Sequence, residues 1–458
     1  MATATPLAYN TGSPISGTQQ IGSLSVGFPT SGFTSSPQYW NGPDEDLGYV
    51  IAYPVPAGDH PTPVFDEVTS FLGFLGTKNL PNPFSDETFI YLTNISFNQS
   101  FSSATEASIW LTNNGYWNSY SSKLFIMTIN IPSNGYTVEM PYNNSYTYNG
   151  TIIWGDGNTS ANEYGAQNTY ATAGSYTVTV NGEIGSFRCI FTVMNTVLTS
   201  IIQFGNQFSF GADIGGYFAY CTNLTSIASD IPSGITNMSE MLLNTSSFNS
   251  PIGLWDVSSV TNMRNMFTRS SFNQPIGSWD VSNVTNMGYM FNDNDAFNQD
   301  ISSWDVSSVV NIDGMFNQNG VFNQDISSWD VSSVITMENM FATSVFNQPI
   351  GSWNVSGVTD MAGMFNSAVF NQDIGSWNVS SVITMDSMFY NSTAFNQDIG
   401  SWNVSGVTGM NSMFYNNTVF NQDLSNWCVT LIPSQPMNFD GGATSWVLPK
   451  PVWGTCPT

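Results

Sequence analysis

The chain has 458 residues, of which 41% are hydrophobic, and its six Lys and Arg face 32 Asp and Glu, for a net charge of −26. Such a surface repels phosphate backbones and anionic headgroups, which argues against nucleic acid and membrane surfaces as partners. No apolar run approaches the roughly 18 residues of a membrane-spanning helix, so we expect no membrane insertion. Abundant Gly, Asn, Ser and Thr with little helical periodicity predict a mainly β protein of several domains.

The first region, residues 1–121, is rich in Gly, Pro and aromatic residues and contains no repeat. We expect a β-rich attachment domain, with one short amphipathic helix within residues 104–117 that ends at Asn114-Gly115. The amino terminus has neither a basic segment nor an apolar one, which predicts that the general secretory route does not export the protein.

The second region, residues 122–197, changes to alternating strands. In Trp154-Gly155-Asp156-Gly157 the two glycines permit a tight turn that Asp156 caps, and the strand after Gly174 places Tyr176, Val178 and Val180 on one face. These motifs resemble the PKD-type β-sandwich, in which a His-x-Tyr usually lies between them; here Asn168 takes the place of the histidine. The resemblance implies a spacer or adhesive module without catalytic residues.

The third region, residues 198–427, is organised around one repeated phrase. Phe-Asn-Gln-Asp-Ile-Ser-Ser-Trp-Asp-Val-Ser-Ser-Val, followed by Met-x-x-Met-Phe, returns every 24 or 25 residues. A period of this length is typical of a solenoid, in which each unit buries its apolar face against its neighbours. We expect a strand at Gln-x-Ile-x-x-Trp, with strands about 4.8 Å apart, and a short helix or 3₁₀ turn at Met-x-x-Met-Phe. The recurring methionines are interpreted as core residues rather than metal ligands.

Two polar positions recur within the phrase. An asparagine follows the phenylalanine in every unit, for example Asn273 and Asn298, and can bridge the backbones of successive coils as a ladder. The position after the tryptophan holds Asp256, Asp280, Asp305 and Asp330, and then Asn354, Asn378 and Asn403. Stacked carboxylates could hold calcium. The change to asparagine favours a hydrogen bond from the side-chain oxygen to the backbone instead, so we predict no metal site.

All variation in repeat length falls in the four or five residues between Met-Phe and the next Phe-Asn. Variable length and composition predict a solvent-facing edge. We select five residues on it as binding candidates: Arg269, Asn294, Gln318, Tyr390 and Tyr415. The competing surface is the strand face, where Gln, Asp and Ser recur on each coil in an arrangement suited to a repeating polymer such as a glycan. The connector edge suits one particular partner, and we favour it.

The segment from Ile214 to Met238 and the phrases that follow resemble the leucine-rich repeats of BspA-like surface proteins. A PKD-type module ahead of such repeats is an arrangement associated with that family. The resemblance implies a right-handed leucine-rich-repeat solenoid with an adhesive or recognition role. Residues 1–121 resemble the opening segments of structural proteins from marine tailed phages.

The last region, residues 428–458, breaks the repeat, and we expect it to cap the final coil. Cys428 and Cys456 are candidates for a disulfide, while Cys189 and Cys221 are expected to be buried, free thiols.

The sequence shows little that indicates catalysis. His60 is the only histidine, and we find neither a phosphate-binding loop nor ligand spacing for a metal, so we predict no catalytic residue and no cofactor. Paired carboxylates of the glycosidase type stay open.

We therefore expect a non-enzymatic virion structural protein, a fibre or surface decoration of a phage or large virus. Residues 1–121 would contact other virion proteins, and the repeats would bind a host surface glycan or protein; homo-oligomerisation is left open. Its location would be the virion surface. The alternatives are a bacterial cell-surface adhesin of the BspA-like family and a stable spacer that binds no ligand.

Overall fold

The computed structural model describes residues 124–211 and 215–457 in full, together with seven strands within residues 19–96. The chain divides into two compact units, Met1–Leu124 and Phe125–Thr458. Regular structure is almost entirely β: the described parts contain 15 strands and the single short helix α2 (Met194–Val197). No helix in these parts is long and apolar enough to cross a membrane. The helix expected within residues 104–117 and His60 lie outside the described residues.

The first unit contains two antiparallel sheets. One pairs β1 (Gln19–Ile21) with β2 (Leu24–Val26). The other has the order β3-β4-β7-β6-β5, formed by β3 (Gln38–Asp44), β4 (Gly48–Val55), β5 (Val64–Phe65), β6 (Ser70–Lys78) and β7 (Thr88–Ser96). The β-rich character expected for this region is confirmed, whereas its attachment role stays a prediction.

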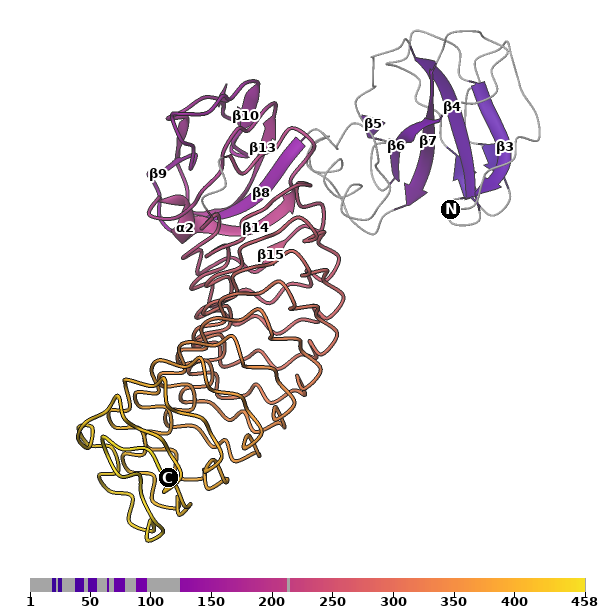
Figure 1. The fold of residues 1–458 in the computed structure, drawn as a ribbon. Helices are drawn as coiled ribbons and strands as arrows, with labels where there is room; N and C mark the ends of the chain where they lie inside the picture. Colours follow the sequence, from indigo (N-terminus) through magenta and orange to yellow (C-terminus); the bar gives the residue numbers. More distant parts are fainter. Residues whose placement is uncertain are drawn as a thin grey trace. The chain divides into compact units, whose positions relative to one another are not determined.

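The second unit begins with a six-stranded sheet of order β11-β10-β13-β8-β14-β15 and a two-stranded sheet, β12-β9 (Figure 1). The strands are β8 (Leu124–Ile131), β9 (Tyr136–Glu139), β10 (Thr151–Ile153), β11 (Thr159–Ala161), β12 (Gln167–Tyr170), β13 (Gly174–Asn181), β14 (Leu198–Gln203) and β15 (Ser226–Ile227). β14 pairs antiparallel with β8 and parallel with β15, which lies in the first coil. The sheet therefore continues across the boundary expected at residue 197, and the two regions are joined by backbone hydrogen bonds.

The turn at residues 154–157 forms for the reasons that the sequence indicates. Gly155 and Gly157 have φ of +85° and +95°, and a Cβ on Gly155 would collide with the carbonyl oxygen of Thr177. Asp156 accepts a hydrogen bond from the backbone N–H of Asn158 at 3.0 Å. Asn168, in the position where the PKD-type pattern has histidine, donates to the other Asp156 oxygen at 2.8 Å. The asparagine thus ties the turn to β12.

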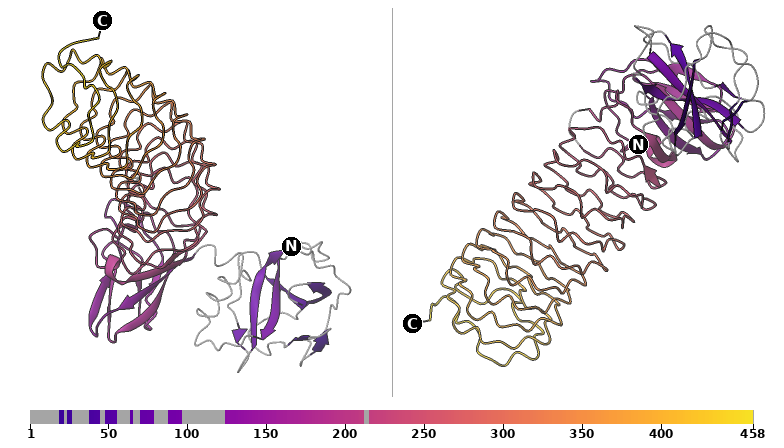
Figure 2. Two further views of the ribbon diagram at one scale, coloured as in Figure 1. Left: turned by 90° about the horizontal axis from the view of Figure 1, so that it is seen from below. Right: turned by 90° about the vertical axis from the view of Figure 1, so that its right-hand side faces the viewer.

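Beyond β15 the repeats stack into one column of coils (Figures 1 and 2). Equivalent side chains lie in register: the rings of Trp255 and Trp279 are 6.4 Å apart and inclined by 7°. The predicted asparagine ladder is confirmed, because Asn273 accepts a hydrogen bond from the backbone N–H of Asn298 at 3.0 Å, and later coils repeat this bond. One continuous apolar core runs from Phe125 to Trp446.

The local structure of each coil differs from the prediction. The Gln-x-Ile-x-x-Trp segment is no strand; it closes a turn in which Trp279 N–H donates to the Ile276 carbonyl at 3.1 Å. The parallel pairing falls on single residues further along, such as Asn262 and Asn286. The Met-x-x-Met-Phe block is no helix either, since Asn265 has a left-handed φ of 57°.

The physical reason is the bonding between coils. Asn265 N–H donates to the Gly288 carbonyl of the next coil at 2.9 Å, and in the same block Phe267 N–H donates to Met290 at 2.9 Å. Because every second N–H points along the column, the backbone cannot keep the uniform dihedral angles of a helix. Pattern spacing alone does not reveal this alternation.

Residues 428–457 cover the last coil. Val429 N–H donates to the Thr455 carbonyl at 2.8 Å, and the Trp446 indole donates to Gln422 O at 2.9 Å. A disulfide joins Cys428 to Cys456, the pair expected from the sequence. Cys189 and Cys221 are buried, free thiols.

Candidate functional site

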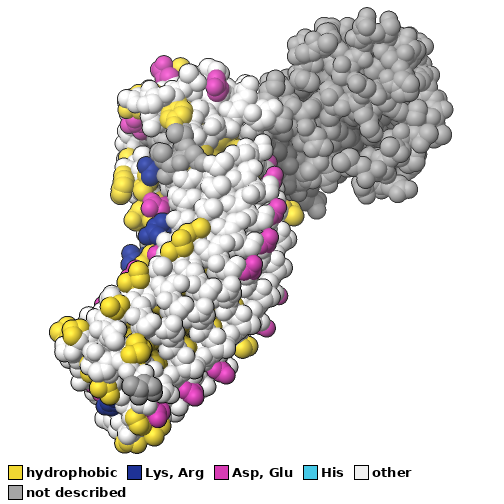
Figure 3. All heavy atoms as spheres, in the orientation of Figure 1, with side chains coloured by type: hydrophobic (Ala, Val, Ile, Leu, Met, Phe, Trp, Pro, Cys, Tyr) yellow, Lys and Arg dark blue, Asp and Glu magenta, His cyan; other side chains and the backbone are white. Residues whose placement is uncertain are grey.

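Every Arg and Tyr between residues 248 and 427 lies in one part of the repeat: Arg264, Arg269, Tyr289, Tyr390 and Tyr415. We call this part the variable edge, defined as the residues of Met263–Ser271 that are not buried and their equivalents in the other coils. Backbone bonds place successive segments side by side, as in Arg269 N–H to Asn292 O at 3.0 Å. Figure 3 shows Lys and Arg side chains on one edge of the column and a row of Asp and Glu on the opposite edge.

Arg264 and Tyr289 form a contact between neighbouring coils. The guanidinium carbon lies 4.9 Å from the centre of the tyrosine ring, within the range of a cation–π interaction. On the next coil Gly314 leaves room for the ring, because a Cβ there would collide with it. Partial burial, together with the nearby carboxylates of Glu338 and Asp313, raises the pKa of Tyr289. The pair presents a fixed aromatic and cationic surface.

Arg269 and Gln318 occupy equivalent positions on this edge and both have left-handed φ, 54° and 55°. The Arg269 side chain is 64% exposed and its Nε donates to Asp293 at 2.8 Å. An exposed pair of this kind contributes little to stability, so the guanidinium can exchange partners. Gln318 is exposed. Both predicted residues are therefore accessible to a partner.

Tyr390 and Tyr415 stack on each other, with ring centres 5.1 Å apart and an angle of 14°. Gly441 of the cap lies against Tyr415, since a Cβ there would be 3.0 Å from its ring. Both tyrosines are half-buried. They form a short aromatic ladder that offers its outer surface, rather than both ring faces, to a partner.

The prediction that Asn294 binds a partner is wrong, because its side chain is fully buried. Its Nδ2 donates to the carbonyls of Phe267 and Phe272 at 3.3 and 3.4 Å, and its Oδ1 accepts from Ala296 and Phe297 N–H, both at 3.0 Å. Asn319 and Asn417 are buried at the equivalent position. A polar residue recurs at this position in the sequence, and that recurrence could have indicated a structural role.

The carboxylates after each tryptophan are structural. Asp256 accepts from Ser258 N–H at 3.1 Å and from its hydroxyl at 2.6 Å, and Asn354 accepts the same two bonds from Ser356 at 3.2 and 2.7 Å. The Ser258 hydrogen bonds lower the pKa of Asp256. The predicted backbone bond is thus confirmed for both residue types. Within residues 124–211 and 215–457, no three His, Cys, Asp or Glu are grouped to hold a metal.

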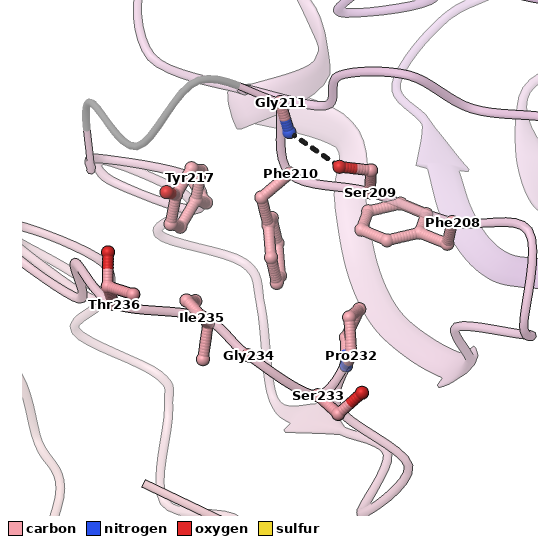
Figure 4. A pocket seen from close by; sticks show the side chains of 10 residues that line it. All are labelled: Phe208, Ser209, Phe210, Gly211, Tyr217, Pro232, Ser233, Gly234, Ile235 and Thr236. Carbon is pink, nitrogen blue, oxygen red and sulfur yellow. Dashed lines mark hydrogen bonds between the residues drawn. The ribbon is translucent and has the colours of Figure 1, made fainter. Parts of the chain in front are cut away.

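A hollow of about 200 Å³ lies beside the first coil and is lined by residues 208–211, Tyr217 and residues 232–236, among them the aromatic residues Phe208 and Phe210 (Figure 4). The ring centres of Phe210 and Tyr217 are 4.2 Å apart, and Ser209 Oγ accepts a bond from Gly211 N–H at 3.0 Å. These aromatic side chains are buried and belong to the core. The lining has no charged residue, so this hollow offers shape but little specificity.

Comparison with known proteins gives one match. A family model described as "Mycoplasma protein of unknown function, DUF285" matches residues 212–319, 236–346, 268–369 and 342–444. The matched region, residues 212–444, is just over half of the 458-residue chain and fits the resemblance to BspA-like repeats. No curated protein and no solved structure matches the chain.

Proposed function

The chain belongs to the DUF285 family, and we propose that it is a non-enzymatic surface protein that recognises a host glycan or protein through the variable edge. In the form that we favour, it is a virion structural protein, a fibre or surface decoration of a phage or large virus. Residues 1–121 attach it to other virion proteins, and the repeats face outward.

One observation carries this proposal: the arginines and tyrosines of the repeats are confined to one edge, whereas the buried positions of each coil are fixed by packing. Both arginines and all three tyrosines of residues 248–427 lie on that edge. Arginine and tyrosine are the residues that most often anchor an interface. Because the edge differs from coil to coil, it is suited to one particular partner rather than to a repeating lattice.

The proposal includes a fold assignment. We infer that the stacked coils are a leucine-rich-repeat solenoid and that residues 122–197 are a PKD-type sandwich. The hydrogen bonds between equivalent residues of successive coils support the first assignment, and the Trp154–Gly157 turn with its Asn168 tie supports the second. A solenoid suits recognition because it presents a long surface on a rigid support.

Two features support display at high local density. The net charge of −26 makes neighbouring copies repel one another and resist association. The first unit, Met1–Leu124, is compact by itself, so an attachment role would not require the repeats to take part. Both features suit a protein that decorates a surface.

The test is binding of the full chain to arrays of host glycans and host surface proteins. We expect the Arg269→Ala variant and the Tyr390→Ala, Tyr415→Ala double variant to lose at least about tenfold in affinity, the loss expected for anchor residues. Asp330→Asn, outside the variable edge and hydrogen-bonded to Ser332 N–H of its own turn, is the matched control and should bind as the parent does. Equal binding by all variants would reject the variable edge.

The second candidate is a bacterial cell-surface adhesin, favoured by the description of the family as Mycoplasma proteins. The same edge would then contact a host cell or matrix. Mass spectrometry of purified particles and of proteins released from the bacterial surface separates the two settings. Detection in particles supports the virion role, and detection only on bacterial cells supports the adhesin.

A further inference from the structure

A second feature, separate from the variable edge, lies where the six-stranded sheet meets the first coil. A pocket of about 320 Å³ opens there between residues 141–144, Tyr164 and residues 186–192. Arg188 is the single charged residue in its lining, which contains no Asp or Glu. In a chain of net charge −26, a pocket with one cation and no carboxylate is set apart from the rest of the surface.

Arg188 is held in place by its surroundings. Its Nε donates to the Gly215 carbonyl at 2.9 Å, and its guanidinium lies against Gly216, where a Cβ would be 3.0 Å from Nη2. Gly216 has φ of +69°, so a larger residue is disfavoured there by its backbone as well. No carboxylate of the described residues forms an ion pair with this guanidinium, whereas Arg269 and Lys450 each pair with an aspartate.

The floor and rim of the pocket are aromatic and amide groups. Tyr142 is buried, stacks on Tyr148 with ring centres 4.2 Å apart, and donates to Asn162 at 2.7 Å, so its ring is fixed. Tyr164 is 55% exposed at the rim. Asn143 and Asn144 are exposed and add side-chain amides. Fixed aromatic surface with a few polar groups is the usual composition of a small-ligand site.

Phe191, between the lining residues Ile190 and Thr192, adds the most unusual feature. It is 85% exposed and has a left-handed φ of 60°. Its ring stacks with that of Tyr220, which is 39% exposed and has φ of 65°, at 6.0 Å between centres. Left-handed φ recurs along the coils at residues that bond to the next coil, Tyr220 among them, so exposure of the ring rather than backbone conformation sets Phe191 apart. Phe191 does not line the pocket itself, but its exposed ring flanks two lining residues and offers apolar surface to a ligand that extends beyond the pocket.

We propose that this junction pocket binds a carbohydrate unit that carries a carboxylate, a uronic-acid type of sugar. The Arg188 guanidinium pairs with the carboxylate, for which its planar fork is suited. The exposed ring of Phe191, next to Tyr220, covers the C–H face of a sugar ring. The rim amides of Asn143 and Asn144 bond sugar hydroxyls. The proposal goes beyond the variable edge and stands or falls independently of it.

The experiment measures binding of the full chain to a hyaluronan tetrasaccharide, which alternates glucuronate with N-acetylglucosamine, by calorimetry and saturation-transfer NMR. Chitotetraose, which lacks the carboxylates, is the matched uncharged probe. We expect the hyaluronan fragment to bind at least about tenfold more tightly, because a charge-assisted pair is lost with the other probe. Arg188→Gln should remove this preference by a similar factor.

Phe191→Gly separates binding from folding. Glycine adopts the left-handed conformation freely, so this variant should melt at the same temperature as the parent or higher, yet bind at least about tenfold more weakly. Leu254→Ala removes an 89% exposed leucine elsewhere and should change nothing. Tyr390→Ala with Tyr415→Ala should also leave this binding intact.

Three results would overturn the proposal: no binding of the hyaluronan fragment, equal binding of both probes, or unchanged binding by Phe191→Gly. Preferential binding of a short peptide through its terminal carboxylate, with no sugar bound, would also reject it, because the site would then recognise a different class of molecule.

Discussion

The buried positions of the coils and the variable edge are built from the same repeat but follow different constraints. At the buried positions each side chain meets its own copy 24 or 25 residues away, as Trp304 meets Trp329 at 6.4 Å with an angle of 6°. One departure from the pattern there disturbs two neighbours. On the variable edge, contacts such as Arg264 with Tyr289 join unlike residues. Stacking in register therefore fixes the residue type at the buried positions, whereas the variable edge can change its residues and acquire a binding role.

The comparison is tested most severely by Trp329→Ala. The indole is 4% exposed and donates to Ile301 O at 3.1 Å, so truncation leaves a cavity and an unpaired carbonyl. We expect a loss of about 3–5 kcal/mol in the free energy of unfolding. Gln318→Ala on the variable edge should stay within about 0.5 kcal/mol. Chemical denaturation followed by tryptophan fluorescence and circular dichroism measures both, and similar losses would contradict the distinction.

The end of the column should respond strongly as well, because its last coil is covered by the non-repetitive cap instead of a further repeat. The disulfide from Cys428 to Cys456 spans 28 residues, and its removal should cost about 3 kcal/mol. The Cys428→Ser, Cys456→Ser double variant should unfold earlier in denaturant than the parent, and added reductant should lower the parent to the same midpoint. If reductant still lowers the unfolding midpoint of the double variant, its effect does not come from the Cys428–Cys456 disulfide.

Asn294 lies in a variable connector and yet belongs to the core. Asn294→Ala leaves two carbonyls and two N–H groups without their partner, at a cost of about 1–3 kcal/mol. Asn294→Ser introduces the residue type that a later coil buries at the equivalent position, Ser392, and should recover part of the loss. A cost below that of Gln318→Ala would show that this residue belongs with the free edge.

The smallest effect concerns pH. Hydrogen bonds from Ser258, Ser307 and Ser332 lower the pKa of Asp256, Asp305 and Asp330. A pKa lowered in the folded state stabilises the fold above the unfolded value and loses that contribution as the pH falls through the folded pKa. Stability should therefore decline below about pH 4. Changing all three to Asn should flatten this decline slightly, and an unchanged acid profile would contradict the assignment.

Much of this architecture follows from the sequence, because periodicity reports packing directly. The Trp and Phe columns, the asparagine ladder and the Cys428–Cys456 disulfide are as predicted. The strand predicted within the coil is wrong, and the Met-x-x-Met-Phe block forms single turns, such as Met266 N–H to Met263 O at 3.2 Å, rather than a helix. The alternation of bonds within and between coils does not appear in the spacing of apolar residues. The surface position predicted for Asn294 is wrong, because a connector of variable length and composition can still contain a buried residue.

The junction pocket was missed for a different reason. Phe191 and Arg188 stand in no repeat and no motif, and their importance comes from the exposure of a ring and from a contact with the first coil. The sequence does not show whether an aromatic side chain such as Phe191 is exposed, and the site is recognised only once its exposure is known. The role of residues outside the repeats of the second unit therefore could not be predicted without the structure.

If the variable edge recognises the partner while the buried part of each coil maintains the fold, one binding measurement should separate the two roles. A variant with Arg264, Arg269, Tyr289, Tyr390 and Tyr415 all changed to Asn is compared, on the glycan and protein arrays, with a variant carrying Asn at Asp256, Asp305 and Asp330. We predict that the first retains its circular dichroism spectrum and loses binding, while the second keeps both. Full binding by the edge variant, or equal loss by both, would show that the protein does not recognise its partner through the variable edge.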